Sequence, residues 1–377
     1  MPWFVSPRTT GKANNQHSQM QTIPILHTGI PLADWRQKCL FTISLITIFF
    51  TFQASAQDTI RVETYRLGDV DTITTTQSKA DSLAFGKYYK DTVLIPNYKK
   101  RQRLVALSGI ALYGGTLLAL NQAWYAKYER SSFHTFNDNK EWLQVDKVGH
   151  GWSAYQLSRL TYGAWKWSGV SGKKAVLLAG LSGPGFLTVV EILDGFTREW
   201  GWSWGDMGAN VFGGGLFVAQ QLGWHEQRID FKFSVHKNNY NNAQLTARAN
   251  KLFGSSLPER FLKDYNSQTY WLSANLKSFF KQSNLPAWLN VAVGYGGNGM
   301  FGAFENVGKG DNGIITFDRR DIKRYRQWYL SPDIKWSKIK TNSKFLRTVL
   351  SVMDGIKFPL PGLELSEGRL QLRGVVF

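Results

Sequence analysis

The sequence predicts an α+β protein: a bundle of about four apolar, Gly-rich helices over residues 99–225, then a β-rich, antiparallel unit over 226–377. Apolar runs of helix length fill the first part, and the stretch from Leu104 to Leu120 carries no charge. After Trp224 the hydrophobic period changes to two, as in Ile229-x-Phe231-x-Phe233-x-Val235. This change of period separates a helical part from a sheet.

Composition limits the class of protein. Of 377 residues, 43% are hydrophobic and 14% aromatic, including 15 Trp, which excludes disorder for most of the chain. The formal net charge of +18 suits nucleic acid or anionic lipid. We find no nucleic-acid-binding motif, and the apolar helices favour membrane lipid, so lipid is the expected partner and protein partners stay open. The single cysteine, Cys39, excludes a disulfide framework or a Cys-based zinc site.

Residues 1–56 are expected to be an N-terminal extension and a secretory signal peptide. Arg36 and Lys38 precede an apolar run, and Ala54-Ser-Ala56 supplies a cleavage site. The run is shorter than the roughly 20 residues of a membrane-spanning helix. We expect cleavage near Ala56 and export to the cell envelope, facing the periplasm or in the outer membrane. Cys39 opens the apolar run instead of following it, so it is not a lipobox cysteine.

The mature chain begins with a Thr- and Asp-rich segment, 57–98, which reads as an exposed arm. Basic residues at 99–103 then precede the first apolar helix, where they suit anionic headgroups. Three further helix-length runs follow at 151–167, 174–193 and 207–223. Pro184 lies inside the second of these and is expected to kink or break it. If short loops join these three helices, they alternate in direction.

The β-rich unit contains five predicted strands and a helix over 343–353 that ends before Gly355. The strands are expected at 229–235, 270–276, 289–295, 328–336 and 369–377. These are too few for a closed membrane barrel, which needs about eight. Two interpretations stay open: a partly membrane-facing sheet, and an ordinary periplasmic antiparallel sheet, which is slightly favoured.

Alternation of the three central helices predicts one polar site at one end of the bundle. The start of the first helix, the end of the second and the start of the third meet there, and each carries a pair of polar residues on one face. The residues expected in a metal site or polar network are Asp146, His150, Glu191, Asp194, Asp206 and Asn210. Lys147 and Arg198 are expected to balance the acidic charge, and Ser203 or Asp206 to cap the third helix.

Carboxylates beside an imidazole point to two kinds of chemistry. They bind divalent metals such as Zn²⁺ or Mn²⁺. They also serve as general acid and base, for which the expected catalytic residues are His150, Glu191 and Asp206. A simpler interpretation treats the same residues as helix caps, ion pairs and hydrogen bonds between helices.

The patterns D-K-x-x-H at Asp146, E-x-x-D at Glu191 and S-x-x-D-x-x-x-N-x-x-G at Ser203 resemble the YfiM-like family of predicted periplasmic lipoproteins, a domain of unknown function. The resemblance covers about residues 140–225. Bacteroidetes-type members are also similar around 264–271 and 326–333. A weaker likeness connects the same polar residues to VanZ-like membrane proteins, associated with glycopeptide-antibiotic resistance. The resemblance implies an envelope location and no established activity.

Three functions remain open from the sequence. The first is a non-enzymatic, membrane-associated envelope protein with a polar or metal site. The second is a membrane-surface hydrolase or transferase acting on a lipid-linked anionic group. The third is a binding module for anionic glycolipid or peptidoglycan that uses the basic and aromatic β-rich part. A nucleophilic triad, an H-E-x-x-H motif and a phosphate-binding P-loop are all absent from the sequence.

Overall fold

The computed structural model describes residues 97–123, 125, 128–240, 242–310 and 313–377. All of these residues belong to one compact unit. The predicted signal peptide and nearly all of the exposed arm lie outside the described residues. Helices precede an antiparallel sheet, so the predicted α+β class is confirmed.

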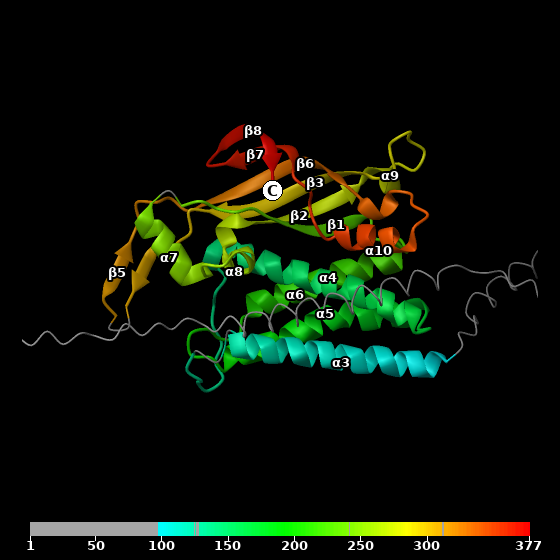
Figure 1. Ribbon diagram of the computed structural model, residues 1–377, viewed down its shortest axis with the longest axis horizontal. Helices are drawn as coiled ribbons and strands as arrows, with labels where there is room; N and C mark the ends of the chain where they lie inside the picture. The colour runs from blue at the N-terminus through cyan, green and yellow to red at the C-terminus, as the bar shows by residue number, and fades with distance from the viewer. Residues whose placement is uncertain (1–96, 124, 126–127, 241, 311–312) are drawn as a thin grey trace, which may run out of the picture. The chain divides into compact units, whose positions relative to one another are not determined.

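Four long helices form the bundle: α3 (Tyr98–Ala123), α4 (Val145–Trp167), α5 (Gly172–Gly195) and α6 (Trp204–Gly223). Short connections make α4, α5 and α6 alternate in direction, as Figure 1 shows. Glycines allow α4 to approach its neighbours closely. A Cβ atom at Gly183 would collide with the carbonyl oxygen of Ala154, and one at Gly213 with that of Gly151. Close backbone approach at these two positions fixes how the helix ends meet.

The helix expected to kink or break at Pro184 is not broken, because α5 continues through this residue. A proline removes the hydrogen bond to the carbonyl four residues earlier, here that of Gly180. The Ser158 hydroxyl of α4 donates to the Ala154 carbonyl at 2.8 Å and also lies 3.4 Å from the Gly180 carbonyl oxygen. The freed carbonyl therefore has a polar neighbour on α4, in a long and weak contact.

Six strands form the main sheet in the order β1-β2-β3-β6-β7-β8, all antiparallel. Their bounds are β1 Ile229–Val235, β2 Gln268–Asn275, β3 Leu289–Asn298, β6 Tyr325–Ile334, β7 Leu360–Ser366 and β8 Arg369–Val376. The sheet lies on the bundle with α4 beneath it (Figure 1). The core between them joins Trp152 and Tyr155 of α4 to Phe231, Phe233 and Tyr270 of the sheet.

Smaller elements surround this core. Helices α7 (Ala243–Phe253) and α8 (Leu257–Lys263) connect β1 to β2, and a two-stranded sheet pairs β4 (Val307–Lys309) with β5 (Ile315–Asp318). Helices α9 (Leu276–Phe279) and α10 (Lys344–Met353) follow β2 and β6. The Ser343 hydroxyl caps α10 by accepting a hydrogen bond from the Leu346 amide, so the helix expected at 343–353 is confirmed.

Within the part of the chain that the structure describes, two helices are long and apolar enough to cross a membrane, namely Tyr98–Gln122 and Gly172–Gly195. Only 6% of the most apolar window of the first helix is buried, compared with 33% for the second. Leu107, Ile110 and Leu118 of α3 are each more than half exposed. The outer surface of the bundle is therefore apolar, which is unusual for a surface in contact with water.

Candidate functional site

The starts of α4 and α6 and the end of α5 meet at one end of the bundle. Asp146 and His150 lie in the first two turns of α4, and Glu191 lies in the last turns of α5. Asp206 lies in the first turn of α6, where the Ser203 hydroxyl accepts a hydrogen bond from its amide at 3.1 Å. Ser203 is therefore the N-cap, and the positive end of the helix dipole favours the Asp206 carboxylate.

His150 joins the three helices. Its Nδ1 atom lies 3.2 Å from Asn210 Oδ1 on α6 and 3.6 Å from Glu191 Oε1 on α5. Glu191 is only 2% exposed and also accepts a hydrogen bond from the Ser203 amide. The Asn210 side-chain nitrogen is buried and has no hydrogen-bond partner among the described residues. The imidazole is thus held by groups on both neighbouring helices.

Lys147 is the cation at the centre of the acidic groups. Its Nζ atom lies 2.9 Å from Asp206 Oδ1, 2.8 Å from Asp138 Oδ2 and 3.8 Å from Asp146 Oδ2. Asp138 also accepts a hydrogen bond from the Ser203 hydroxyl at 2.5 Å. One ammonium group is therefore shared by three carboxylates.

Asp138 is held in its ionised form although it is half-buried. Burial alone would raise the pKa of its carboxyl group, but hydrogen bonds from Asp206, Lys147 and Ser203 lower it below the ordinary value. Burial, with a contribution from the nearby Asp146, raises the pKa of the Asp206 carboxyl group from 3.8 to about 7. Crowded, buried carboxyl groups retain protons in this way when too few cations are present.

Two of the expected residues have other neighbours. Asp194 lies in the same cavity, where its carboxylate is hydrogen-bonded with Tyr125. The expectation that Arg198 balances the cluster is wrong, because its guanidinium pairs with Glu129 and both side chains are mostly exposed. Arg198 lies past the end of α5, where water and Glu129 stabilise its charge without burial.

Asp138 and Glu141 were not among the residues expected from the sequence, and both line the site. Burial, together with the nearby Asp138 and Asp146, raises the pKa of Glu141 from 4.5 to about 7. These two acids precede α4 and belong to no periodic pattern. The sequence contained one signal for them: both lie shortly before Asp146. A loop that folds back just before a helix brings its side chains close to the start of that helix.

Tyr265 is the other residue that the sequence did not reveal as part of the site. Its hydroxyl donates a 2.7 Å hydrogen bond to Asp146 Oδ1. It belongs to the stretch Asp264–Trp271, which carried part of the family resemblance. The sheet side of the molecule therefore contributes directly to the polar end of the bundle.

The backbone leading into α4 is strained. Trp142, Leu143 and Gln144 have φ angles of 45°, 53° and 64°, in the left-handed region that residues with a Cβ rarely adopt. The Tyr295 hydroxyl donates to the Leu143 carbonyl, and Arg326 donates to the Gln144 side chain at 2.6 Å. Groups from β3 and β6 thus hold a turn that places Asp146 and Lys147.

These side chains enclose a cavity of about 270 Å³. Its lining includes six carboxyl groups, those of Asp138, Glu141, Asp146, Glu191, Asp194 and Asp206. Ligand atoms of Asp146, His150 and Asp206 all lie within 4.8 Å of one another. Two carboxylates and an imidazole at this separation are a donor set suited to Zn²⁺ or Mn²⁺.

One family model matches this part of the chain. Residues 134–220 match the family described as predicted periplasmic lipoprotein (DUF2279). The match covers less than a quarter of the chain and contains every expected site residue. No curated protein and no solved structure matches the chain.

The match supports the location expected from the sequence. The protein is an exported protein of the cell envelope, and the matched domain has no assigned function. A lipoprotein is anchored in a membrane, in agreement with the predicted association with membrane lipid.

Proposed function

We propose that the acidic cavity is a divalent-cation site in a membrane-associated envelope protein, with Asp146, His150 and Asp206 as ligands. The observation that carries the proposal is the position of their ligand atoms, all within 4.8 Å of one another on a cavity of about 270 Å³. Because Glu191 and Asn210 both approach His150 Nδ1, the proposal assigns Nε2 to the cation.

The charge balance of the cavity supports a cation. Six carboxyl groups face two cationic groups, Lys147 and His150, so full ionisation would leave four uncompensated negative charges. Such charges repel strongly in a weakly polar setting. The protein reduces the repulsion by keeping protons on carboxyl groups, as the pKa values of Glu141 and Asp206, both raised to about 7, indicate. A divalent cation would replace these protons.

The competing interpretation is that the cluster only joins the helices. Lys147 bridges Asp138 and Asp206, and Tyr265 ties Asp146 to the sheet side, which are contacts that a structural network requires. This interpretation predicts no stoichiometric affinity for a metal.

The negative charge of the cavity also limits which substrates it can bind. An acidic cavity repels an anionic glycolipid, so direct binding of such a group here is disfavoured. A bound divalent metal would reverse this, because it polarises phosphoryl or carbonyl oxygens and activates water. Within the proposal, Glu191 orients the imidazole and Lys147 holds Asp206. A hydrolase or transferase acting on a lipid-linked anionic group is therefore the second candidate, conditional on the metal.

The YfiM-like, Bacteroidetes-type likeness belongs to the same proposal. It is supported by Tyr265, which lies in the Asp264–Trp271 stretch outside the matched segment and yet contacts Asp146. Relatives that share both segments would then share the complete set of cavity contacts.

Metal titration of the purified full chain tests the proposal. The detergent-solubilised protein, stripped with a chelator, is titrated with Mn²⁺ and Zn²⁺ by calorimetry. We expect one cation per chain, with affinity that rises as the pH increases through 7 because protons are released. Asp146→Asn should weaken binding by roughly 10-fold or more. Asp321→Asn, which changes an exposed acid paired with Arg319, is the matched control and should bind normally. Absence of stoichiometric binding, or equal binding by Asp146→Asn, would leave the structural network as the function of the cluster.

A further inference from the structure

One face of the main sheet is apolar across its whole width. The strand register places one residue from each of five neighbouring strands in a row, and every member is between 37% and 79% exposed. This row, here called the apolar row, consists of Leu272, Val293, Leu330, Leu363 and Leu372. The adjacent row continues the pattern with Trp328, Leu365 and Leu370. Helix α4 covers this face only over the first strands.

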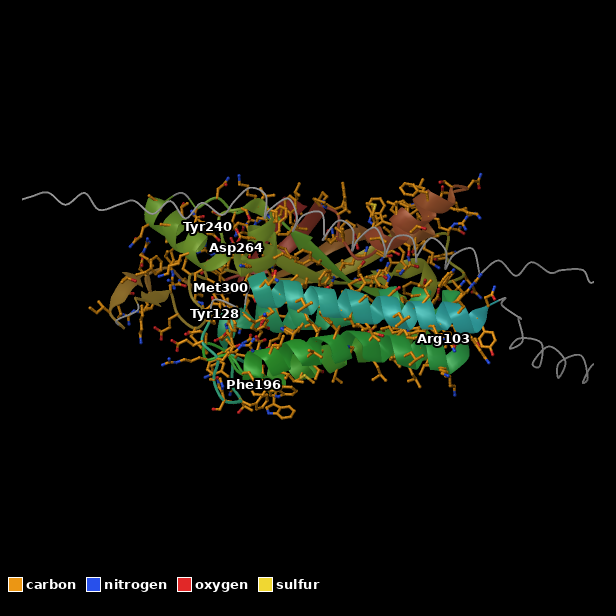
Figure 2. The ribbon with its side chains drawn as sticks, turned by 60° about the horizontal axis from the view of Figure 1, so that its bottom comes forward. Arg103, Tyr128, Phe196, Tyr240, Asp264 and Met300 are labelled. Atoms are coloured by element: carbon orange, nitrogen blue, oxygen red, sulfur yellow. The ribbon has the colours of Figure 1, made fainter. Side chains whose placement is uncertain are left out.

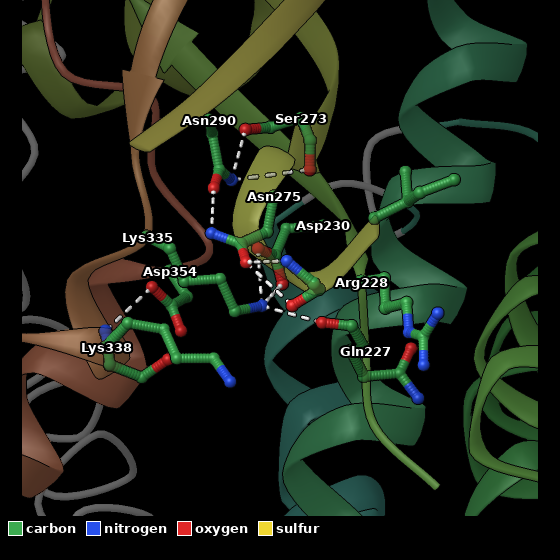
Figure 3. A network of polar contacts seen from close by, with 12 residues as sticks. Gln227, Arg228, Asp230, Ser273, Asn275, Asn290, Lys335, Lys338 and Asp354 are labelled. Atoms are coloured by element: carbon green, nitrogen blue, oxygen red, sulfur yellow. Dashed lines mark hydrogen bonds and ion pairs between the residues drawn. The ribbon is translucent and has the colours of Figure 1, made fainter. Parts of the chain in front are cut away.

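The opposite face of the same sheet is polar and buried. Lys232 and Asp333 form an ion pair of 2.8 Å with both side chains 0% exposed. Lys335 contacts both carboxylate oxygens of Asp230 at 2.7 Å, and Asn290 donates to the Ser273 hydroxyl at 2.8 Å (Figure 3). The end of β8 folds over this side, where Val376 packs against Trp271. This side of the sheet thus contains buried ion pairs and amides beside a small apolar cluster around Trp271.

This distribution is the reverse of that in water-soluble sheets. A soluble antiparallel sheet buries its apolar face and exposes its polar one. A sheet in a lipid bilayer does the opposite, with apolar residues outward and polar residues inward. Strands β3 and β6 are each 10 residues long, which matches the 9–11 residues of a strand that spans the hydrocarbon layer.

The ends of the helices and the ends of the strands lie at the same two levels of the molecule. Trp204 and Trp224 lie at opposite ends of the 20-residue helix α6, so they are roughly 30 Å apart, the thickness of the hydrocarbon layer. Trp224 packs against Phe279 of α9, the helix that directly follows β2, with ring centroids 5.4 Å apart, and Tyr295 of β3 donates to Leu143 just before α4. Exposed aromatic side chains at such levels are typical of membrane interfaces.

Side chains at the two ends of the bundle differ in charge. In Figure 2, the labelled residue Arg103 lies at one end of the bundle, and the labelled residues Tyr128 and Phe196 lie at the other. Lys99, Lys100, Lys173 and Lys174 lie at the Arg103 end, at the starts of α3 and α5, whereas the acidic cavity lies at the other end. Between the two ends, α3 exposes apolar side chains. Lipid headgroups contact polar ends of this kind on either side of an apolar belt.

We infer that the apolar row contacts the hydrocarbon chains of a lipid bilayer, so that the sheet lies within the membrane beside the helices. A lipid surface is favoured over a protein partner because the exposed apolar surface lies on α3 as well as on the sheet, and lipid covers both at once. At the β1 edge, the backbone of Phe233 is also paired. It accepts from the Lys357 amide at 2.9 Å and donates to the Gly355 carbonyl at 3.1 Å, and paired backbone is what a hydrocarbon setting requires. This inference does not depend on the cation site.

Site-directed spin labelling tests the inference. In a Cys39→Ser background, single cysteines at Val293, Leu330 and Leu372 receive a nitroxide label. A cysteine at Lys340, which is exposed in the connection between β6 and α10, is the aqueous control. The full chain is reconstituted into vesicles of phosphatidylethanolamine and phosphatidylglycerol. Collision with oxygen, which concentrates in lipid, is compared with collision with a water-soluble nickel chelate.

We expect oxygen to dominate several-fold at Val293, Leu330 and Leu372, and the nickel chelate to dominate at Lys340. Equal access of the nickel chelate to all four labels would overturn the inference, because the row would face water. Protection of the three labels from both reagents would also overturn it, in favour of a protein partner or a second copy of the chain. Recovery of the chain as a soluble protein without detergent would have the same effect.

Discussion

Replacement of Glu141 by Gln should stabilise the protein above neutral pH. The carboxyl group of Glu141 has its pKa raised from 4.5 to about 7 by burial and by Asp138 and Asp146. A raised pKa means that the folded state retains a proton that the unfolded chain has lost. Stability therefore falls as the pH rises from about 4.5 to 7 and stays lower above that range. Gln cannot ionise, so the variant lacks this loss.

The size of the effect follows from the shift. About 2.5 pKa units correspond to about 3.4 kcal/mol as an upper value. Glu141 is not fully buried, and water screens part of its interaction with the other acids, so about 2 kcal/mol is the expected gain at pH 8. At roughly 2–4 °C per kcal/mol, the unfolding midpoint should rise by about 4–8 °C.

Thermal unfolding of the detergent-solubilised protein at pH 4 and pH 8 measures this difference. The variant and the parent should unfold at nearly the same temperature at pH 4 and diverge at pH 8. Glu129→Gln, which alters an exposed acid paired with Arg198, is the control and should shift the midpoint little at either pH. A Glu141→Gln variant that gains nothing at pH 8, or gains equally at both pH values, would refute the electrostatic account of the cavity.

Two further predictions concern the packing that supports the site. Lys232→Met should destabilise the fold by about 3–5 kcal/mol in thermal unfolding, because it leaves Asp333 buried without its cation, and adding Asp333→Leu should recover most of the loss. A double variant as unstable as the single one would contradict this. Gly183→Leu should prevent the close approach of α5 to α4 and lower the yield of folded protein. Gly215→Ala, which meets no atom within 4 Å, should fold normally and gain up to about 1 kcal/mol; equal yields from both variants would disprove the packing argument.

Much of the fold and part of the site followed from local pattern. Spacings of three and four residues placed Asp146 beside His150 and Asp206 beside Asn210, and short loops made the helices alternate, which was enough to bring His150 to Glu191. Strand β7 was not predicted, because Pro361 and Gly362 interrupt its alternation.

The remaining site residues depend on contacts that no local pattern contains. Tyr265 reaches Asp146 across a separation of 119 residues. Pro184 does not break α5, and the Gly180 carbonyl that it leaves without its helical donor lies 3.4 Å from the Ser158 hydroxyl of a second helix. Arg198 was expected near the cluster only because it follows α5 in the sequence. Its side chain is instead exposed to solvent, where it pairs with Glu129.

The left-handed turn before α4 has a consequence for the order in which the protein matures. Trp142, Leu143 and Gln144 are held by Ala303, Tyr295 and Arg326, all of which are synthesised and exported after the helices. Until those residues arrive, the turn has local contacts such as the bond from the Gln144 side chain to the Asn139 carbonyl, and it lacks the three contacts from β3, β6 and the segment between them. The acidic cavity therefore takes its final form only when the chain as far as β6 has folded. A nascent or truncated chain that ends near Gly223 contains the whole matched segment and still lacks a finished site.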